Sequence, residues 1–140
     1  MTVVAMPEEA KFAPEGDAVL VTGIGALNVI AVLRDVPRHT PIYNVGYAGA
    51  SGIEIGTVCH VGRVTAFHPI ADYADRVYQL DGDVPCYTAG DFVTEADIDE
   101  PCVFDMELAY ILALGFTNVR ADKIVSDNLS MKEYETTKRG

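Results

Sequence analysis

An apolar run, a glycine turn and a helical pattern follow one another early in the chain, and this order most constrains the fold. Ala18–Thr22 predicts a buried strand that ends at the turn Gly23-Ile24-Gly25. Apolar residues then recur at helical spacing as far as Leu33, and Pro37 lies beyond the end of this helix. Because strands and helices alternate along the chain, we expect a single α/β domain over residues 1–140, in three α/β/α layers around a central mixed sheet.

The remaining segments extend this pattern. Further strands are predicted at Thr2–Met6, Ile42–Val45, Thr57–Phe67, Val84–Ala89, Val103–Met106 and Asn118–Val125. The run Ile42–Val45 is interrupted by Gly46, Gly49 and Gly52, and Thr57–Phe67 has a break at Gly62. A second helix is predicted at Glu107–Leu114, stopped by Gly115. His68–Asp83 is polar and acidic without a clean period, so we expect a loop there with at most one helical turn.

The chain is acidic, with 10 Lys and Arg against 21 Asp and Glu and a formal net charge of −11. A chain of this charge repels phosphate backbones, which excludes polymeric nucleic acid as a partner. Small anionic ligands stay open, because backbone N–H groups at the start of a helix can bind them.

The cysteines, Cys59, Cys86 and Cys102, are scattered and lack CxxC spacing, so we expect reduced, mostly buried thiols, no zinc site and no cofactor. The first ten residues have no basic region before an apolar run, which does not fit a secretory signal. No apolar stretch reaches the length that a bilayer requires. We therefore expect a cytoplasmic protein without a membrane partner.

Two glycine segments are candidates for contact with a ligand. The turn Gly23-Ile24-Gly25 lacks the third glycine of a dinucleotide fingerprint, because Asn28 stands at that offset. In Asn44–Ala50, small residues directly follow a strand and would let a ligand approach the main chain at the carboxyl edge of the sheet.

Several ordered segments together resemble the nucleoside phosphorylase and nucleosidase superfamily, and most closely the 5′-methylthioadenosine/S-adenosylhomocysteine nucleosidases. They are Ala5-Met6-Pro7-Glu8-Glu9, Thr22-Gly23-Ile24-Gly25, Asn44–Gly56, Ala89-Gly90-Asp91-Phe92, and Asp105-Met106-Glu107 followed by Ser126-Asp127. The resemblance spans most of the chain and implies a phosphorylase/hydrolase-like fold in an abbreviated form.

The resemblance also implies the roles of individual residues. Glu9 would activate water, Met106 and Glu107 would hold the ribose hydroxyls, and Asp127 would donate a proton to purine N7. Further substrate contacts would come from Phe92 and Val93 against the base and from the glycine segment at Tyr47, Ala48 and Gly49.

Each of these residues also has a plain structural interpretation. Glu9 and Glu107 are acids in the first turn of a helix, where the helix dipole favours them. Asp127 suits an N-cap or a turn, and Met106 and Phe92 suit a core.

The implied reaction requires acids of this kind. Breaking the bond between adenine and ribose spreads positive charge over the sugar, so a carboxylic acid must neutralise the departing base while a carboxylate activates water. Superfamily phosphorylases hold phosphate with an arginine and a serine, and this chain has Asn44 and Tyr47 at the matching positions. We therefore favour water as the nucleophile.

Departures from the family pattern keep alternatives open. Tyr47 stands where a small hydroxyl residue is usual, and loops between the motifs are shorter, so a homo-oligomer, a dimer or higher, would complete the site. Phe67 and His68 lie near the segment that the family exchanges across a dimer. A futalosine-type hydrolase and a catalytically inactive nucleoside-binding or assembly module are the competing hypotheses, with a phosphorylase as a weaker one.

Overall fold

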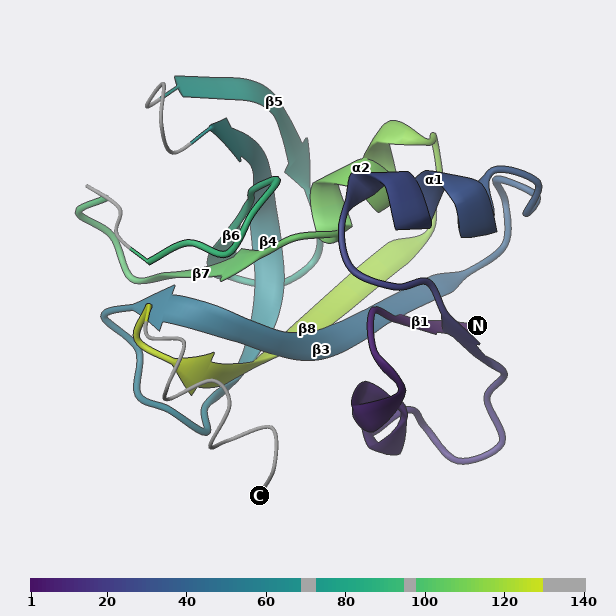
Figure 1. Ribbon diagram of the computed structural model, residues 1–140, viewed down its shortest axis with the longest axis horizontal. Coiled ribbons are helices and arrows are strands. Elements are labelled where there is room, and N and C mark those ends of the chain that lie inside the picture. Colours follow the sequence, from purple (N-terminus) through teal and green to yellow (C-terminus); the bar gives the residue numbers. More distant parts are fainter. Residues whose placement is uncertain (69–72, 95–97, 130–140) are drawn as a thin grey trace.

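The computed structural model describes residues 1–68, 73–94 and 98–129 (Figure 1). Its strands are β1 Thr2–Val4, β2 Val19–Val21, β3 Ile42–Ser51, β4 Val58–His68, β5 Tyr73–Gln79, β6 Val84–Thr88, β7 Cys102–Asp105 and β8 Val119–Asp127. The helices are α1 Ala26–Leu33 and α2 Leu108–Ala113, and η1 at Pro7–Phe12 is a 3-10 helix. The predicted strands and helices are confirmed in kind, with shifts of a few residues at their ends.

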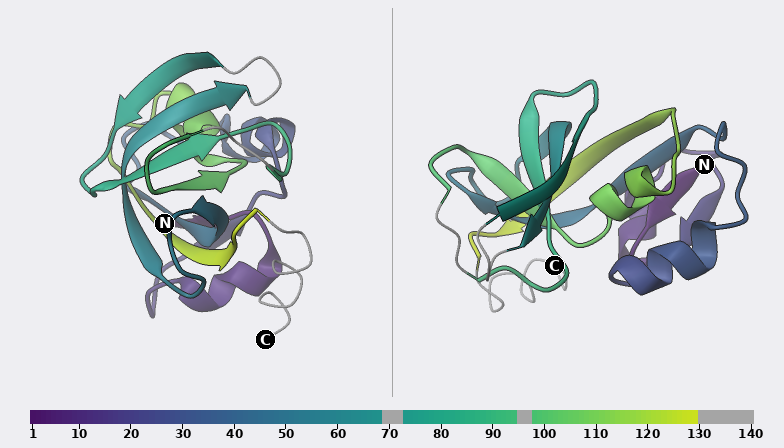
Figure 2. Two further views of the ribbon diagram at one scale, coloured as in Figure 1. Left: turned by 90° about the vertical axis from the view of Figure 1, so that its left-hand side faces the viewer. Right: turned by 90° about the horizontal axis from the view of Figure 1, so that it is seen from above.

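The strands form one sheet of mixed direction in which five members close into a ring. β8 pairs in parallel with β3 and antiparallel with β4, and the path then runs through β6 and β7 back to β3. β1 and β2 extend the sheet from the first half of β3, and β5 lies against β4. Figure 2 shows the resulting curvature from two further directions. This closure brings β3, β7 and β8 together around one interior.

Glycines do not end the two long strands, contrary to the prediction. β3 continues through Gly46 and Gly49 to Ser51, and β4 continues through Gly62. A Cβ atom at Gly46 would stand 2.5 Å from Glu9 Oε2, and one at Gly62 would stand 2.3 Å from the backbone oxygen of Gly82. These glycines therefore mark close approaches within the sheet, where no side chain fits.

The loop predicted for His68–Asp83 is wrong at Tyr73–Gln79, which forms strand β5. β5 pairs in antiparallel with β4, and its Val77 is exposed. Such a strand forms without the alternation of apolar and polar residues on which the prediction relied. Residues 69–72 of that segment lie outside the described residues.

A mixed α/β fold with a central sheet and few helices is thus confirmed, and the predicted three layers stay a prediction. α1 and α2 contact each other, and η1 lies on the other side of β3 (Figure 1). The interior of the ring holds an apolar cluster that includes Val61, Val64, Val103, Leu108 and Val125. A second cluster lies under α1, built on Val3, Val29, Leu33, Ile42, Ile111 and Phe116.

All of Cys59, Cys86 and Cys102 are buried free thiols, as expected. Within the described ranges, no helix is both long and apolar enough to cross a membrane.

Candidate functional site

Glu9 turns back from η1 and buries its carboxylate against β1 and β3. Oε1 accepts hydrogen bonds from the backbone N–H groups of Ala5 and Met6, both at 3.1 Å, and Oε2 accepts one from Tyr47 at 2.8 Å. Burial raises the pKa of Glu9, although these N–H donors and the charge of Lys123 oppose the rise. Glu9 lies in the first turn of η1, as its plain structural interpretation expects, but its carboxylate is fixed in the interior and is not solvated.

Glu107 is also buried, directly before α2. Its Oε2 accepts a hydrogen bond from the N–H of Gly25 at 2.9 Å, which ties it to the glycine turn ahead of α1. The pKa of Glu107 is raised to about 7, first by burial and then by the charge of Asp105, while the charge of Lys123 and the N–H of Gly25 oppose the rise. Glu9 adds to the same rise, so Glu9 and Glu107 belong to one electrostatic cluster.

Lys123 lies at the centre of this cluster with only 2% of its surface exposed. Its Nζ donates to Asn44 Oδ1 at 2.7 Å and lies 3.1 Å from Asp105 Oδ2. Burial favours a lower pKa for Lys123, but the negative charges around it, first that of Asp105, raise its pKa above the ordinary value. The same ion pair holds the pKa of Asp105 below its usual range against the effect of burial.

No sequence motif predicts Lys123 or the role of Asp105. A signal was present, because Ala121, Lys123 and Val125 alternate along β8 and all three are buried. A lysine at an inward position of a strand requires a buried anion as its partner.

Asp127 ends β8 with no exposed surface. The hydroxyl of Ser126 donates to Asp127 Oδ1 at 2.7 Å, and Oδ2 lies 3.0 Å from the place where a Cβ at Gly49 would stand. Gly49 is the register partner of Asp127 across the β3 and β8 pair. Asp127 is therefore neither an N-cap nor an exposed turn residue, because it closes the interior at the carboxyl end of β8.

Glu9 and Asp127 meet the same strand at different points. Glu9 lies against Gly46 and Tyr47, and Asp127 lies against Gly49, three residues farther along β3 and roughly 10 Å away at the rise of a strand. Glu9 and Glu107 both act on the charge of Lys123, whereas Asp127 lies at a separate position along β3.

The glycine segment between these acids is mostly enclosed. Ala48 is buried, Gly49 is half-buried, and the half-exposed ring of Tyr47 packs edge-on against Phe12 at a centroid distance of 5.3 Å. Tyr47 therefore has an apolar partner on η1.

The other predicted contacts occupy two neighbouring segments. Met106 is half-buried between Asp105 and Glu107, and Phe92 is half-buried before the buried Val93. Val93 and Phe67 share an apolar cluster with Phe104. The side chain of His68 lies outside the described residues.

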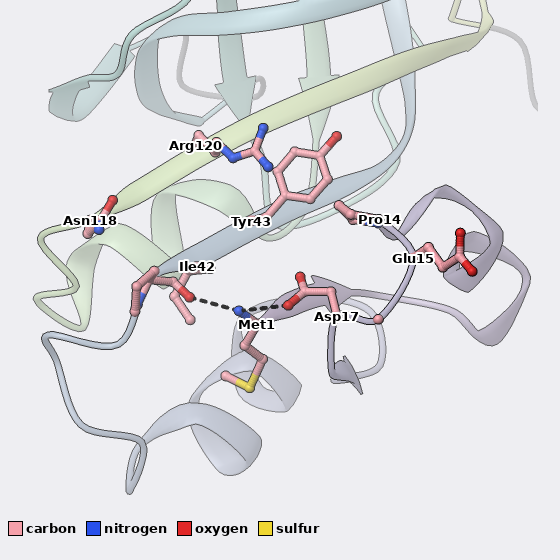
Figure 3. Close-up of a pocket in the computed structure, with 10 residues that line it drawn as sticks. Met1, Pro14, Glu15, Asp17, Ile42, Tyr43, Asn118 and Arg120 are labelled. Carbon is pink, nitrogen blue, oxygen red and sulfur yellow. Dashed lines mark hydrogen bonds and ion pairs between the residues drawn. The ribbon is translucent and has the colours of Figure 1, made fainter.

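Two open cavities lie away from these acids. One, of about 420 Å³, is lined by residues that include Met1, Asp17, Tyr43 and Arg120, which Figure 3 shows around the first residues of β3. The other, of about 430 Å³, is lined by residues that include His60, Asp83 and Asp122. In the part of the chain that the structure describes, no group of three or more His, Cys, Asp or Glu side chains is arranged to hold a metal ion.

Comparisons with known proteins find similarity in structure. No family model and no curated protein matches the sequence. A variant of the MTAN from Chlamydia trachomatis, solved bound to MTA, superposes with a TM-score of 0.79 and 14% identity, over 99% of this chain and 88% of that one.

Two further solved structures give the same result. The S-adenosylhomocysteine nucleosidase from Streptococcus pyogenes, in complex with 5-methylthiotubericidin, has a TM-score of 0.74 and 18% identity over 96% of this chain and 87% of its own. The 5′-methylthioadenosine/S-adenosylhomocysteine nucleosidase from Neisseria meningitidis, in complex with methylthio-immucillin-A, has a TM-score of 0.76 and 15% identity over 97% and 90%.

Proposed function

We propose, from the fold that this chain shares with the 5′-methylthioadenosine/S-adenosylhomocysteine nucleosidases, that it is a purine nucleoside hydrolase. The reaction is cleavage of the N-glycosidic bond of a 5′-thio-substituted adenosine, with water as the nucleophile. The observation that carries this proposal is that two carboxylates, Glu9 and Glu107, are buried and each is held by backbone N–H groups, Glu9 at the glycine segment of β3 and Glu107 at the glycine turn before α1.

Glu9 is the proposed base that activates water. A carboxylate has about four acceptor positions, and backbone N–H groups occupy three of those on Glu9. The position left on Oε2 can accept a proton from water. Because burial raises the pKa of Glu9, its carboxylate is a stronger base than an exposed glutamate.

Glu107 is the proposed ligand of the ribose hydroxyls, with Met106 beside it. Oε2 is held by Gly25, and Oε1 accepts no hydrogen bond from the described residues, so it can take a sugar hydroxyl. As positive charge develops on the ribose, an anionic Glu107 attracts it more strongly than it attracts the ground state.

Asp127 is the proposed acid that protonates purine N7. Its burial and its hydrogen bond from Ser126 fix the direction of the carboxyl group beside Gly49. Phe92 and Val93 would pack against the base, and Tyr47, Ala48 and Gly49 would form the floor of the same pocket.

The surroundings of Asn44 support water over phosphate. Asn44 is buried, donates to the backbone oxygen of Val3 at 3.0 Å and accepts from Lys123, so both ends of its amide are engaged. Lys123 is neutralised by Asp105 at 3.1 Å. Both side chains are buried and engaged with protein partners, so neither is the exposed arginine or set of hydroxyl donors that holds a phosphate dianion.

A chromatographic assay of base release tests this proposal, run with and without phosphate over a panel of nucleosides. We expect free adenine from methylthioadenosine at a rate independent of phosphate. Glu9→Gln should abolish release while Glu8→Gln, at the exposed neighbour, should not. Asp127→Asn should likewise abolish it, and Asp35→Asn at an exposed site on the surface is the control.

Other outcomes of the assay select the competing hypotheses. Release of hypoxanthine from a futalosine analogue with methylthioadenosine untouched identifies a futalosine-type hydrolase. Binding of adenine nucleosides without any product identifies an inactive binding module, and a requirement for phosphate identifies a phosphorylase. We propose further that the chain acts as a single domain in a homo-oligomer that completes the pocket.

A further inference from the structure

The buried ammonium group of Lys123 contacts the two side chains that hold the backbone next to Glu9 and Glu107. The Nζ atom of Lys123 donates to Asn44 at 2.7 Å and lies 3.1 Å from Asp105. These two partners come from different parts of the chain, Asn44 from β3 and Asp105 from the end of β7.

The first branch leads to Glu9. Asn44 Nδ2 donates to the backbone oxygen of Val3 at 3.0 Å and thereby fixes β1 against β3. The chain leaves β1 through Ala5 and Met6, whose N–H groups hold Glu9 Oε1. The direction of the Glu9 carboxylate thus depends on the position of β1.

The second branch leads to Glu107. Asp105 Oδ2 accepts hydrogen bonds from the N–H groups of Leu108 at 2.8 Å and Glu107 at 3.3 Å, which fixes the first residues of α2. The hydroxyl of Thr88 donates to Asp105 Oδ1, and Thr88 accepts from the N–H of Ala109 at 3.0 Å. The Glu107 backbone is therefore set by Asp105, the ion-pair partner of Lys123.

We propose that Lys123 is a positioning residue that sets Glu9 and Glu107 relative to each other, through Asn44 on one side and Asp105 on the other. This inference rests on the proposed hydrolase function. A buried ion pair is a weak source of stability, because apolar residues of the same volume would fill the space at lower cost. The hydrogen bonds of Lys123, Asn44 and Asp105 connect two glutamates that are distant in sequence. An apolar residue at position 123 could not make these connections.

The kinetic test uses variants that keep the volume of the side chain. Lys123→Met removes the cation, and Lys123→Met with Asp105→Asn removes both charges, so that neither is left buried alone if the single variant fails to fold. We expect kcat/KM for base release to fall roughly 100-fold in the folded double variant, the loss associated with misplacing reacting groups by about 1 Å. The control is Arg34→Met at the exposed residue directly after α1, which should retain wild-type rates.

A second readout does not depend on activity. The charged and titratable groups that influence Glu107 are Asp105, Lys123 and Glu9, and its own charge acts on Tyr110. Following the Glu107 carboxyl by 13C NMR, with Glu107→Gln to assign it, should show a pKa raised above about 7 in Lys123→Met. In the double variant the pKa of Glu107 should return to the wild-type value or below it, because the negative charge of Asp105, which raises this pKa, is also removed.

The outcomes separate the two proposals. A folded double variant with wild-type kcat/KM, or an unchanged Glu107 titration in a folded Lys123→Met variant, overturns the positioning role and leaves the hydrolase function intact. A wild-type protein that releases no base overturns the function, and the titration then decides whether Lys123 still controls Glu107.

Discussion

Gly46 lies so close to Glu9 that a single methyl group should displace the carboxylate. A Cβ at this position would stand 2.5 Å from Oε2 and 2.9 Å from Cδ of Glu9. Gly46 does not have a positive φ angle, so Gly46→Ala leaves the backbone of β3 unstrained, and the nearest atoms that the new Cβ meets are those of the Glu9 carboxylate. To regain an ordinary contact the carboxylate must retreat by roughly 0.9 Å.

A retreat of this size breaks the hydrogen bond from the N–H of Tyr47, which is now 2.8 Å long. A hydrogen bond to a charged group contributes about 1.5–3 kcal/mol, so we expect Gly46→Ala to lower the free energy of unfolding by about 2 kcal/mol. Since the displaced group is the proposed base, kcat/KM for base release should fall about 100-fold. Urea unfolding followed by circular dichroism and the chromatographic assay measure the two effects.

Gly90→Ala is the matched control for stability. A Cβ at Gly90 would meet only the Tyr110 hydroxyl, at 3.8 Å, and the position has no positive φ angle. Its unfolding free energy should stay within about 1 kcal/mol of wild type. If Gly46→Ala is fully folded and releases base at the wild-type rate, the assignment of Glu9 as the base is refuted.

Three further predictions follow from the buried groups. The pKa of Glu107 is about 7 in the folded chain against an ordinary 4.5, so the folded state holds this proton more tightly and stability should fall by up to about 3 kcal/mol as pH rises through that window. Glu107→Gln should flatten that slope in urea titrations at several pH values, and an unchanged slope would contradict the assignment. Lys123→Met should lower the free energy of unfolding by about 3–5 kcal/mol, because Asp105 is left buried without its partner. Adding Asp105→Asn should restore most of this loss, and equal stability of the two variants would argue against the ion pair. Leu33→Ala, at a fully buried position on α1, should cost about 2–5 kcal/mol, whereas Leu27→Ala on the same helix, 84% exposed, should change little; similar melting temperatures for the two variants would count against the packing of α1.

Local patterns in the sequence predicted most elements, because apolar runs and helical spacing report burial directly. Ala26–Leu33 and Cys102–Asp105 agree with the predicted segments to within a residue. β5 was missed because an edge strand buries little apolar surface and so lacks the alternation that marks a strand. The ring closure could not be predicted, since it depends on β8 pairing with both β3 and β4, which are distant in sequence.

The candidate site was predicted in part, because only some of its residues belong to recognisable motifs. Motif resemblance selected Glu9, Glu107 and Asp127, which are all buried in the fold. It did not select Lys123, because a lone lysine in a strand carries no motif and only its register between Ala121 and Val125 shows that it points inward. The sequence predicts breaks at the glycines of β3, but in the structure these glycines make room for Glu9 and Asp127.

A crystal structure with a methylthioadenosine analogue bound tests the central claim most directly. We expect one nucleoside along β3, with its ribose hydroxyls on Glu107, the anomeric carbon facing Glu9 and purine N7 within hydrogen-bonding distance of Asp127. A nucleoside bound instead in the cavity beside Tyr43 and Arg120, or one that touches Glu9 and Glu107 while Asp127 stays out of reach of the base, would contradict it.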